Sequence, residues 1–346
     1  MFNYYQRLKL SSLLNRPLVT PLSATIYVTT RCQSRCKYCF AWSTSEANQE
    51  PALSTIACIL KELKQLKIGS VTIGGGEPLL RNDLEDIIAL STKENIKSTI
   101  LTSGTLLSPE RLSAIIEAGA SSIILSLDSL DPATNQQQRG VPPPVEALHI
   151  ISASLTRSFF GGVTCVVTSQ NYRQLPDLAT KIHQLAQGRM AIRFQPYHNL
   201  YTQRVASWSV QGDVTTPDTT PQFSEDLLPQ LEAVVNKLLF LKEQGVAIDN
   251  SPQFLKALPN FAILGTLPPD YSCYAGYTKL FIMPNLDVRS CWSLPAIGNL
   301  QSTTLKDIYF SKGYQRRRQE MIKLNCPQCL LLCSYEMLHL NQRSRK

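Results

Sequence analysis

Three cysteines near the N-terminal end have the types and the spacing of an iron–sulfur ligand set. Cys32, Cys36 and Cys39 are separated by three residues and then by two. Three thiolates at this spacing can converge on one centre, and a [4Fe–4S] cluster held by three cysteines keeps one iron without a protein ligand. Because an open iron can bind a substrate or a cosubstrate, the spacing indicates a catalytic cluster rather than a purely structural metal site.

Zinc is the alternative occupant of this loop. Structural zinc sites take four ligands, and no fourth cysteine or histidine lies near the triad. The four histidines of the chain are all remote in sequence: His149, His183, His198 and His339. The sequence therefore favours an iron–sulfur cluster over zinc.

A glycine run follows the second expected strand, at Gly74, Gly75 and Gly76, and leads into Glu77 and Pro78. Glycines let a ligand approach the backbone, whose N–H and C=O groups then become available. Alone, such a run is typical of a tight turn between a strand and a helix. Beside a three-cysteine loop on the preceding strand, it predicts a binding turn.

The alternation of apolar runs predicts an α/β fold. Six strand–helix units with short connections fit a partial (β/α)6 TIM barrel whose site lies at the carboxyl ends of the strands. The expected strands are 24–29, 70–73, 98–102, 123–127, 162–168 and 190–194, and the expected helices are 53–66, 83–90, 109–118, 145–155 and 175–187.

The remaining segments complete the expected organisation. Residues 1–23 form an N-terminal extension, 24–196 the barrel, 197–265 a linker with helices that include 223–244, and 266–346 a small cysteine-rich domain. In the last segment, strands 279–282 and 287–290 flank a hairpin turn at Pro284 and Asn285, and a helix follows around 305–309.

Bulk composition places the chain among ordinary globular proteins. It has 346 residues, of which 43% are hydrophobic and 17% charged. No stretch approaches the roughly 18 consecutive apolar residues of a membrane span, and residues 1–14 do not resemble a secretory signal. We therefore expect a cytoplasmic protein that makes no membrane contact.

The net charge of +8 comes partly from Arg316, Arg317 and Arg318 and from the tail 343–346. Such runs are usually a solvated helix face and a frayed tail, and an acidic partner is the alternative. Nucleic-acid binding is not expected, because no basic stripe is interleaved with aromatic residues.

Ten cysteines without a secretory signal favour metal binding over disulfides. Cys58 and Cys165 are expected to be small core residues. Apart from these two and the triad, five cysteines lie late in the chain: Cys273, Cys291, Cys326, Cys329 and Cys333. Five thiols can ligate one cluster fully with one to spare, and they are too few for two complete clusters. A structural zinc site and unligated thiols remain the alternatives.

The barrel segment resembles the radical S-adenosylmethionine (SAM) enzymes. The resemblance covers about residues 24–196 and is carried by the cysteine triad with Tyr38, by 74–78, and by 101–105 and 125–129. Arg139 and Gly140 follow after an expected short loop. Where relatives usually carry Asn, this chain has Ser103, which leaves an amide contact there open.

The resemblance implies a set of cofactor contacts. SAM would chelate the open iron, and reductive cleavage would give methionine and a 5′-deoxyadenosyl radical, so no side chain is assigned as a catalytic nucleophile. The implied SAM-binding residues are Tyr38, Gly75, Gly76, Glu77, Ser126, Asp128 and Arg139. For Ser126, Asp128 and Arg139, turn capping or surface pairing stays the alternative.

The C-terminal cysteines resemble the SPASM/twitch extension of these enzymes, together with Gly276 and the run 297–300. The resemblance implies one auxiliary [4Fe–4S] cluster, and which four of the five late cysteines hold iron stays open. A fully ligated second cluster suggests electron transfer and a net oxidation of the substrate.

Most relatives with this extension modify ribosomally made peptides, so the expected function is a peptide or protein maturase. The alternatives are a dehydrogenase of a small molecule such as a sugar or aminocyclitol, and a non-catalytic metal-binding or electron-carrier protein. Expected partners are a precursor peptide, an electron donor such as flavodoxin or ferredoxin, and a separate peptide-recognition protein. Gln195, Tyr197 and His198 are expected to face the substrate space.

Overall fold

A curved parallel sheet forms the centre of the molecule. The computed structural model describes residues 3–39, 50–197, 223–269, 271–331 and 333. Six strands pair in parallel, each with its neighbours in the chain. They are β1 (Ser23–Thr29), β2 (Ser70–Gly75), β3 (Lys97–Thr102), β4 (Ser122–Ser126), β5 (Phe160–Val167) and β6 (Met190–Pro196).

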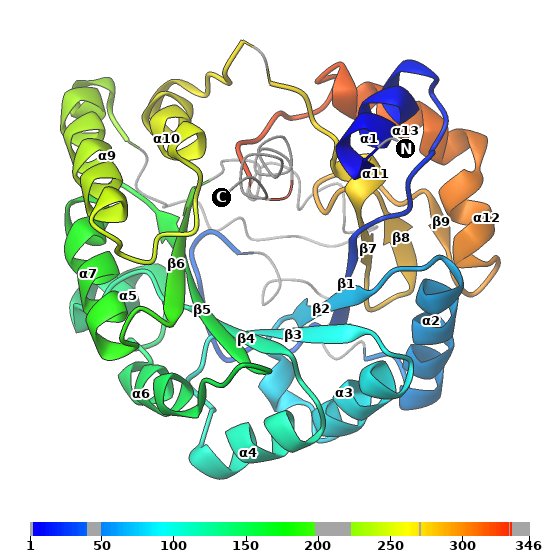
Figure 1. The fold of residues 1–346 in the computed structure, drawn as a ribbon, viewed down its shortest axis with the longest axis horizontal. Helices are drawn as coiled ribbons and strands as arrows, with labels where there is room; N and C mark the ends of the chain where they lie inside the picture. Colours follow the sequence, from blue (N-terminus) through cyan, green and yellow to red (C-terminus); the bar gives the residue numbers. More distant parts are fainter. Residues whose placement is uncertain (1–2, 40–49, 198–222, 270, 332, 334–346) are drawn as a thin grey trace.

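Helices cover the outer side of this sheet, and the curve does not close (Figure 1). The partial barrel predicted from the sequence is therefore confirmed, with its six strands and five connecting helices in the expected order. These helices are α2 (Leu53–Gln65), α3 (Leu84–Lys93), α4 (Pro109–Glu117), α6 (Val145–Ser154) and α7 (Leu175–Leu185).

Helix α2 shows why these segments fold as they do. Its buried residues are Ile56, Ile59, Leu60 and Leu63, the spacing of one helix face turned to a core. Cys58 lies off this stripe and is exposed, so its prediction as a core residue is wrong. Cys165 is buried in β5, as expected.

The C-terminal part continues the barrel sheet rather than folding beside it. Strand β7 (Lys279–Ile282) pairs in parallel with β1 and antiparallel with β8 (Asp287–Arg289), and β8 pairs with β9 (Gly298–Asn299). The predicted hairpin is confirmed. One nine-stranded sheet, in the order β6-β5-β4-β3-β2-β1-β7-β8-β9, thus joins the two cysteine-bearing regions, and the boundary expected at 266 stays a prediction.

Two helices lie beyond the other edge of the sheet. The helix predicted over 223–244 begins later, as α9 (Leu228–Glu243), and α10 (Pro252–Leu264) follows it. The buried Asn250 amide fastens this region to β6, since it accepts a hydrogen bond from Phe194 N at 2.7 Å and donates to Phe194 O at 2.8 Å.

The N-terminal helix α1 (Tyr4–Leu13) packs against the C-terminal helix α13 (Lys312–Ile322), as Figure 1 shows. Tyr277 in α11 (Ala275–Thr278) donates a hydrogen bond from its hydroxyl to Ser11 O at 3.2 Å. Tyr309 in α12 (Leu305–Phe310) donates likewise to Val19 O at 3.1 Å. The first residues of the chain therefore secure the segment that carries the late cysteines.

Two local predictions are wrong. The segment before Arg139 is not a loop but helix α5 (Pro132–Arg139), which starts where Asp131 accepts a hydrogen bond from Thr134 N and ends at Gly140 with φ +69°. Arg318 is 1% exposed and therefore not part of a solvated face, whereas the side chain of Arg316 is 77% exposed.

No helix in the described ranges is long and apolar enough to cross a membrane.

Candidate active site

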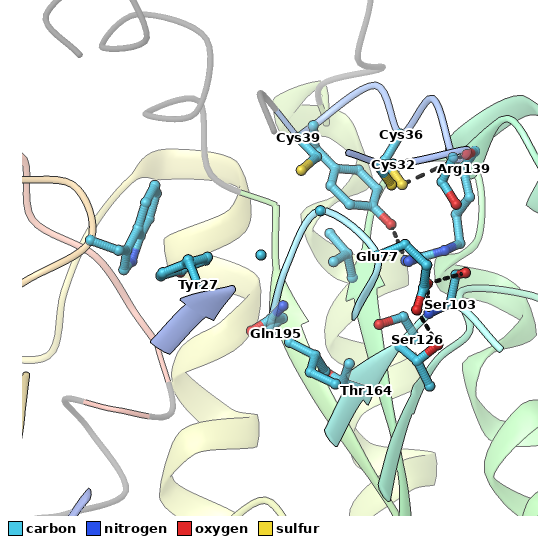
Figure 2. Close-up of a pocket in the computed structure, with 18 of the residues that line it drawn as sticks. Tyr27, Cys32, Cys36, Cys39, Glu77, Ser103, Ser126, Arg139, Thr164 and Gln195 are labelled. Carbon is cyan, nitrogen blue, oxygen red and sulfur yellow. Dashed lines mark hydrogen bonds between the residues drawn. The ribbon is translucent and has the colours of Figure 1, made fainter. Parts of the chain in front are cut away.

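The first three cysteines line one cavity at the carboxyl ends of the barrel strands (Figure 2). Their loop follows β1 directly and is held by backbone hydrogen bonds to the end of α5. Arg35 N donates to Arg139 O and Lys37 N donates to Gln138 O, both at 2.9 Å. Helix α5, which the sequence pattern missed, therefore fixes the path of the cysteine loop.

The glycine turn lies against the same loop. Gly76 N donates to Thr29 O and Glu77 N donates to Arg31 O, both at 2.8 Å. A Cβ on Gly75 would lie 2.4 Å from Thr29 O, and a Cβ on Gly76 would lie 2.0 Å from Arg31 O. Since Gly75 also has φ +130°, the two segments can meet only if both residues are glycine.

Replacement of Gly76 by alanine is expected to weaken SAM binding about 5- to 150-fold, because forcing atoms into a filled space costs about 1–3 kcal/mol. Gly74→Ala is the matched control, since its Cβ would meet only Leu101, at 3.9 Å. Equilibrium binding of SAM to the reconstituted proteins measures the difference. Equal affinities in the two variants would show that this close approach does not shape the site.

The Glu77 carboxylate holds the ends of β2 and β3 together. It is 1% exposed and accepts hydrogen bonds from Leu79 N at 3.2 Å, Thr102 Oγ1 at 2.7 Å, and Ser103 N and Oγ at 2.8 and 2.6 Å. The Ser103 hydroxyl, where an amide contact was left open, thus serves Glu77. The side chain of Glu77 is fully engaged, so its backbone is what the turn can offer a ligand.

A second connection reaches β3 from the cysteine loop itself. Gln33 Nε2 donates to Ser103 Oγ at 3.0 Å and to Thr105 Oγ1 at 2.7 Å. Sequence reasoning missed Gln33, because a polar residue between two cysteines carries no pattern that distinguishes it from its neighbours. The loop is therefore anchored on both sides, by α5 and by the β3 end.

Tyr38, Asp128 and Arg139 form a buried network behind the triad. Arg139 Nη1 donates to Tyr38 Oη at 2.6 Å and to Asp128 Oδ2 at 3.3 Å, and the Tyr38 hydroxyl donates to the same carboxylate. Val166 N donates to Asp128 Oδ1 at 2.8 Å. Burial opposes the charge of Arg139, yet Tyr38, Cys36 and Asp128 raise its pKa well above its usual value.

This network separates the predicted cofactor residues into two groups. Tyr38, Ser126 and Arg139 line the cavity, whereas Asp128 is fully buried behind them. Arg139 Nε has no hydrogen-bond partner among the described residues. Arg139 is therefore the cation that the described wall offers a ligand, and Asp128 orients its guanidinium.

Two aromatic residues that the sequence did not single out also line the cavity. They are Tyr27 on β1 and Trp292, and they share the lining with Thr164 and Gln195. Trp292 follows Cys291 directly, so the second cysteine region contributes to the same cavity of about 250 Å³. Tyr27 alternates along β1 with buried Ile26 and Val28, and this alternation was the only signal for it.

Tyr27 lies between the two sets of cysteines. Its pKa is raised, mainly by burial, and the charges of Cys39 from the first set and of Cys291 and Cys333 from the second add to the rise. Figure 2 shows Tyr27 on the opposite side of the cavity from Cys32 and Cys36. The first set lines the cavity itself, and the second region contributes to it through Trp292, which follows Cys291.

The expected substrate-facing residues at the end of β6 have different positions. Gln195 lines the cavity. Tyr197 packs with Cys36, Tyr38 and Val166 beside the triad. His198 lies outside the described residues.

The five late cysteines share one neighbourhood. Burial raises the pKa of Cys291 to about 11, and Cys333 adds to the rise. Burial also raises the pKa of Cys273 and Cys329, with contributions from their neighbours, which include Cys326. In the described ranges no three Cys, His, Asp or Glu side chains converge as ligands of a single metal ion would, so the ligand set remains a proposal.

Fold and site together define an iron–sulfur protein on an open α/β barrel. Three thiols, a glycine turn and the Arg139 guanidinium border one cavity, which fits a cluster with an open iron and a chelating cofactor that bears a carboxylate. Comparison with known families agrees. The radical SAM superfamily model matches residues 26–182, and the SPASM iron–sulfur cluster-binding model matches residues 273–333.

Residues 26–182 therefore form a radical SAM domain, and residues 273–333 form a SPASM domain. The chain is 28% identical over 183 residues to the PqqA peptide cyclase of Gluconobacter oxydans, and the aligned segment covers 51% of this chain and 50% of the cyclase. It is 27% identical over 281 residues to the mycofactocin maturase MftC of Mycobacterium tuberculosis, covering 80% and 66%. A shorter match, 37% over 129 residues, covers 36% of this chain and 39% of the GTP 3′,8-cyclase of Aquifex aeolicus.

Among solved structures, the fold resembles that of Streptococcus suis SuiB bound to the precursor peptide SuiA. The TM-score is 0.66 at 20% identity, covering 92% of this chain and 72% of SuiB. This likeness supports the fold alone. The chain spans about half the length of the first relative named above, so its activity and substrate are taken up as a proposal.

Proposed function

We propose that this protein is a radical SAM enzyme that modifies a ribosomally made peptide or a protein. The observation that carries the proposal is the single cavity that both cysteine regions border. Cys32, Cys36 and Cys39 line it, and so does Trp292, which is next to Cys291. A substrate placed there would be within reach of both cofactor sites.

The ligands follow from this arrangement. Cys32, Cys36 and Cys39 would hold the first cluster, and four of Cys273, Cys291, Cys326, Cys329 and Cys333 would hold the auxiliary one. When bound, the first cluster and SAM supply a one-electron reduction that yields a 5′-deoxyadenosyl radical, which abstracts a hydrogen atom.

The chain itself supplies binding, orientation and exclusion of water. The backbone of Gly75 to Glu77 and the Arg139 guanidinium would fix the methionyl part of SAM. The Tyr38–Asp128 pair keeps the guanidinium in place. Tyr27 and Trp292 add aromatic surface to the lining of the cavity.

The chemistry of the wall favours a peptide over a nucleotide. Among the described lining residues, Arg139 is the only cationic side chain, and two of its contacts are already internal. A nucleoside triphosphate calls for several charged donors. The neutral groups of Thr164 and Gln195 in the same lining suit a peptide backbone or an uncharged side chain. The names of the two peptide-modifying relatives support the same substrate class.

We further infer a net oxidation of the substrate. Removal of two hydrogen atoms would give one hydrogen atom to the 5′-deoxyadenosyl radical, while the second would leave as a proton to solvent and an electron to a cluster held by the late cysteines. The electron that cleaves SAM would come from a donor such as flavodoxin or ferredoxin. SAM would then be consumed in proportion to product.

The test is anaerobic reconstitution with iron, sulfide, SAM and dithionite, together with any short peptide found encoded beside this gene. We expect release of 5′-deoxyadenosine and a peptide lighter by two hydrogen atoms in the mass spectrum. The Cys36→Ala protein and a peptide of scrambled sequence serve as controls.

Other outcomes separate the alternatives. An unchanged peptide together with product from an added sugar or aminocyclitol would assign a small-molecule dehydrogenase. A product isomeric with the substrate, with SAM regenerated, would contradict the oxidation. A protein that binds metal without cleaving SAM would be a carrier or a structural metalloprotein.

A further inference from the structure

Helix α13 carries a buried cation that the proposed activity does not use. Arg318 is 1% exposed, and its guanidinium carbon lies 4.2 Å from the ring centroids of both Tyr309 and Tyr314 and 5.2 Å from that of Tyr277. Its Nε donates to Gly276 O at 3.0 Å and its Nη2 donates to Tyr309 O at 2.9 Å. The arginine is thus fixed in an aromatic cage.

This cation has no carboxylate partner among the described residues, and its Nη1 forms no hydrogen bond with them. A buried charge is costly unless an opposite charge offsets it. Aromatic faces supply part of this compensation, but they leave the positive charge unbalanced. A negatively charged group bound near this cage would balance the positive charge of Arg318.

The second unpartnered group is the hydroxyl of Tyr314. Tyr314 is fully buried, and its hydroxyl has no hydrogen-bond partner in the described part of the chain. Burial raises its pKa, Arg318 opposes the rise, and Tyr309 and Cys291 add to it. Tyr314 therefore lies against the Arg318 guanidinium, in the same buried core as Cys273 and Cys291.

The backbone places the cage next to the late cysteines. Gly276, whose carbonyl accepts from Arg318, lies three residues after Cys273. A Cβ on Gly276 would lie 3.1 Å from Met321 Sδ and 3.2 Å from Arg318 Cγ, so α11 and α13 are in close contact. The buried Ser290 hydroxyl beside Cys291 also has no partner in these ranges. Buried donors are nearly always satisfied in folded proteins, so the unpaired donors of Tyr314 and Arg318, which lie against each other, indicate an acceptor beside the cage.

We propose that Tyr314 and Arg318 set the reduction potential of the auxiliary iron–sulfur cluster, Tyr314 by donating its unpaired hydroxyl hydrogen to a sulfur of the cluster and Arg318 by placing a buried positive charge near the Cys273 end of the site. A cluster with four thiolates is anionic and gains one more negative charge when it accepts an electron. Hydrogen bonds to sulfur and nearby positive charge both stabilise the reduced form. The pair therefore raises the potential and makes the cluster a better electron acceptor.

The inference rests on the auxiliary cluster and not on the substrate class. Its test is a reductive titration of the reconstituted holoenzyme with dithionite, followed by electron paramagnetic resonance. SAM separates the two signals, because only a cluster with an open iron responds to it. The variants are Tyr314→Phe, Arg318→Met and Arg318→Lys, with Arg316→Met as the control on the exposed side of the same helix.

In Arg318→Met, the reduction equilibrium of the auxiliary cluster is expected to shift at least about tenfold toward the oxidised form, which is ~59 mV for one electron. Tyr314→Phe is expected to shift it several-fold in the same direction, and Arg318→Lys less than Arg318→Met, since the charge is kept. Arg316→Met is expected to match the wild type.

Titration curves of Tyr314→Phe and Arg318→Lys that coincide with the wild-type curve would overturn the proposal and leave the cage a structural support only. If Arg318→Met fails to fold, Tyr314→Phe still decides, because it removes one oxygen atom. The iron content and the thermal unfolding of each variant show whether the cluster and the fold are intact.

Discussion

In the Cys36→Ala protein, release of 5′-deoxyadenosine from SAM is expected to fall to the level measured without enzyme. Cys36 is 6% exposed and lies in the cavity with the other two triad cysteines and the glycine turn. With two thiolates left, the first cluster loses a ligand that no nearby cysteine replaces. The variant is also expected to contain about four fewer iron atoms per chain.

Chromatographic assay of 5′-deoxyadenosine and iron analysis of the purified protein measure both effects. Cys58→Ala is the matched control, because Cys58 is exposed on the outer face of α2 and takes part in neither cysteine set. It is expected to keep full activity and full iron. SAM cleavage by Cys36→Ala at the wild-type rate would exclude the triad as the cluster ligands.

Replacement of Glu77 by alanine is expected to lower the free energy of unfolding by at least ~3 kcal/mol, because several buried donors lose their acceptor at about 1–3 kcal/mol each. These donors are Thr102 Oγ1 and the N and Oγ of Ser103, which hold the β3 end beside the glycine turn. The same change is expected to abolish SAM cleavage, since the turn loses its support.

Urea unfolding of the cluster-free protein measures the stability effect separately from cofactor binding. Glu146→Ala is the control, since Glu146 is exposed on α6 and its loss is expected to leave the unfolding midpoint unchanged. If Glu77→Ala unfolds at the same urea concentration as this control, the hydrogen bonds of the Glu77 carboxylate do not stabilise the fold.

The barrel was largely predictable because its signals are local. Strands β1 to β6 and their helices show the apolar spacing of buried elements, and Cys32, Cys36, Cys39 and the glycine turn are contiguous motifs. Helix α5 was missed because its sequence of Asn and Gln has no apolar stripe. Its end signals, Pro132 in the first turn and Gly140 at the end, were nonetheless present.

What could not be predicted depends on contacts between distant segments. The pairing of β7 with β1, and the resulting approach of Trp292 and Tyr27 in one cavity, joins residues from opposite ends of the chain. The burial of Arg318 is of the same kind. A run of three arginines resembles a solvated face, and only the tyrosines of α11 and α12, together with Tyr314, make one of them internal.

The position of β1 between β2 and β7 has a consequence during synthesis on the ribosome. Ser23 pairs with Lys279, so one edge of the strand that precedes the triad waits for its neighbour until most of the chain has been translated. At ~5–20 residues per second this delay is on the order of 10–50 s. An uncovered strand edge is prone to intermolecular pairing, so nascent chains truncated before β7 should aggregate unless a chaperone shields that edge.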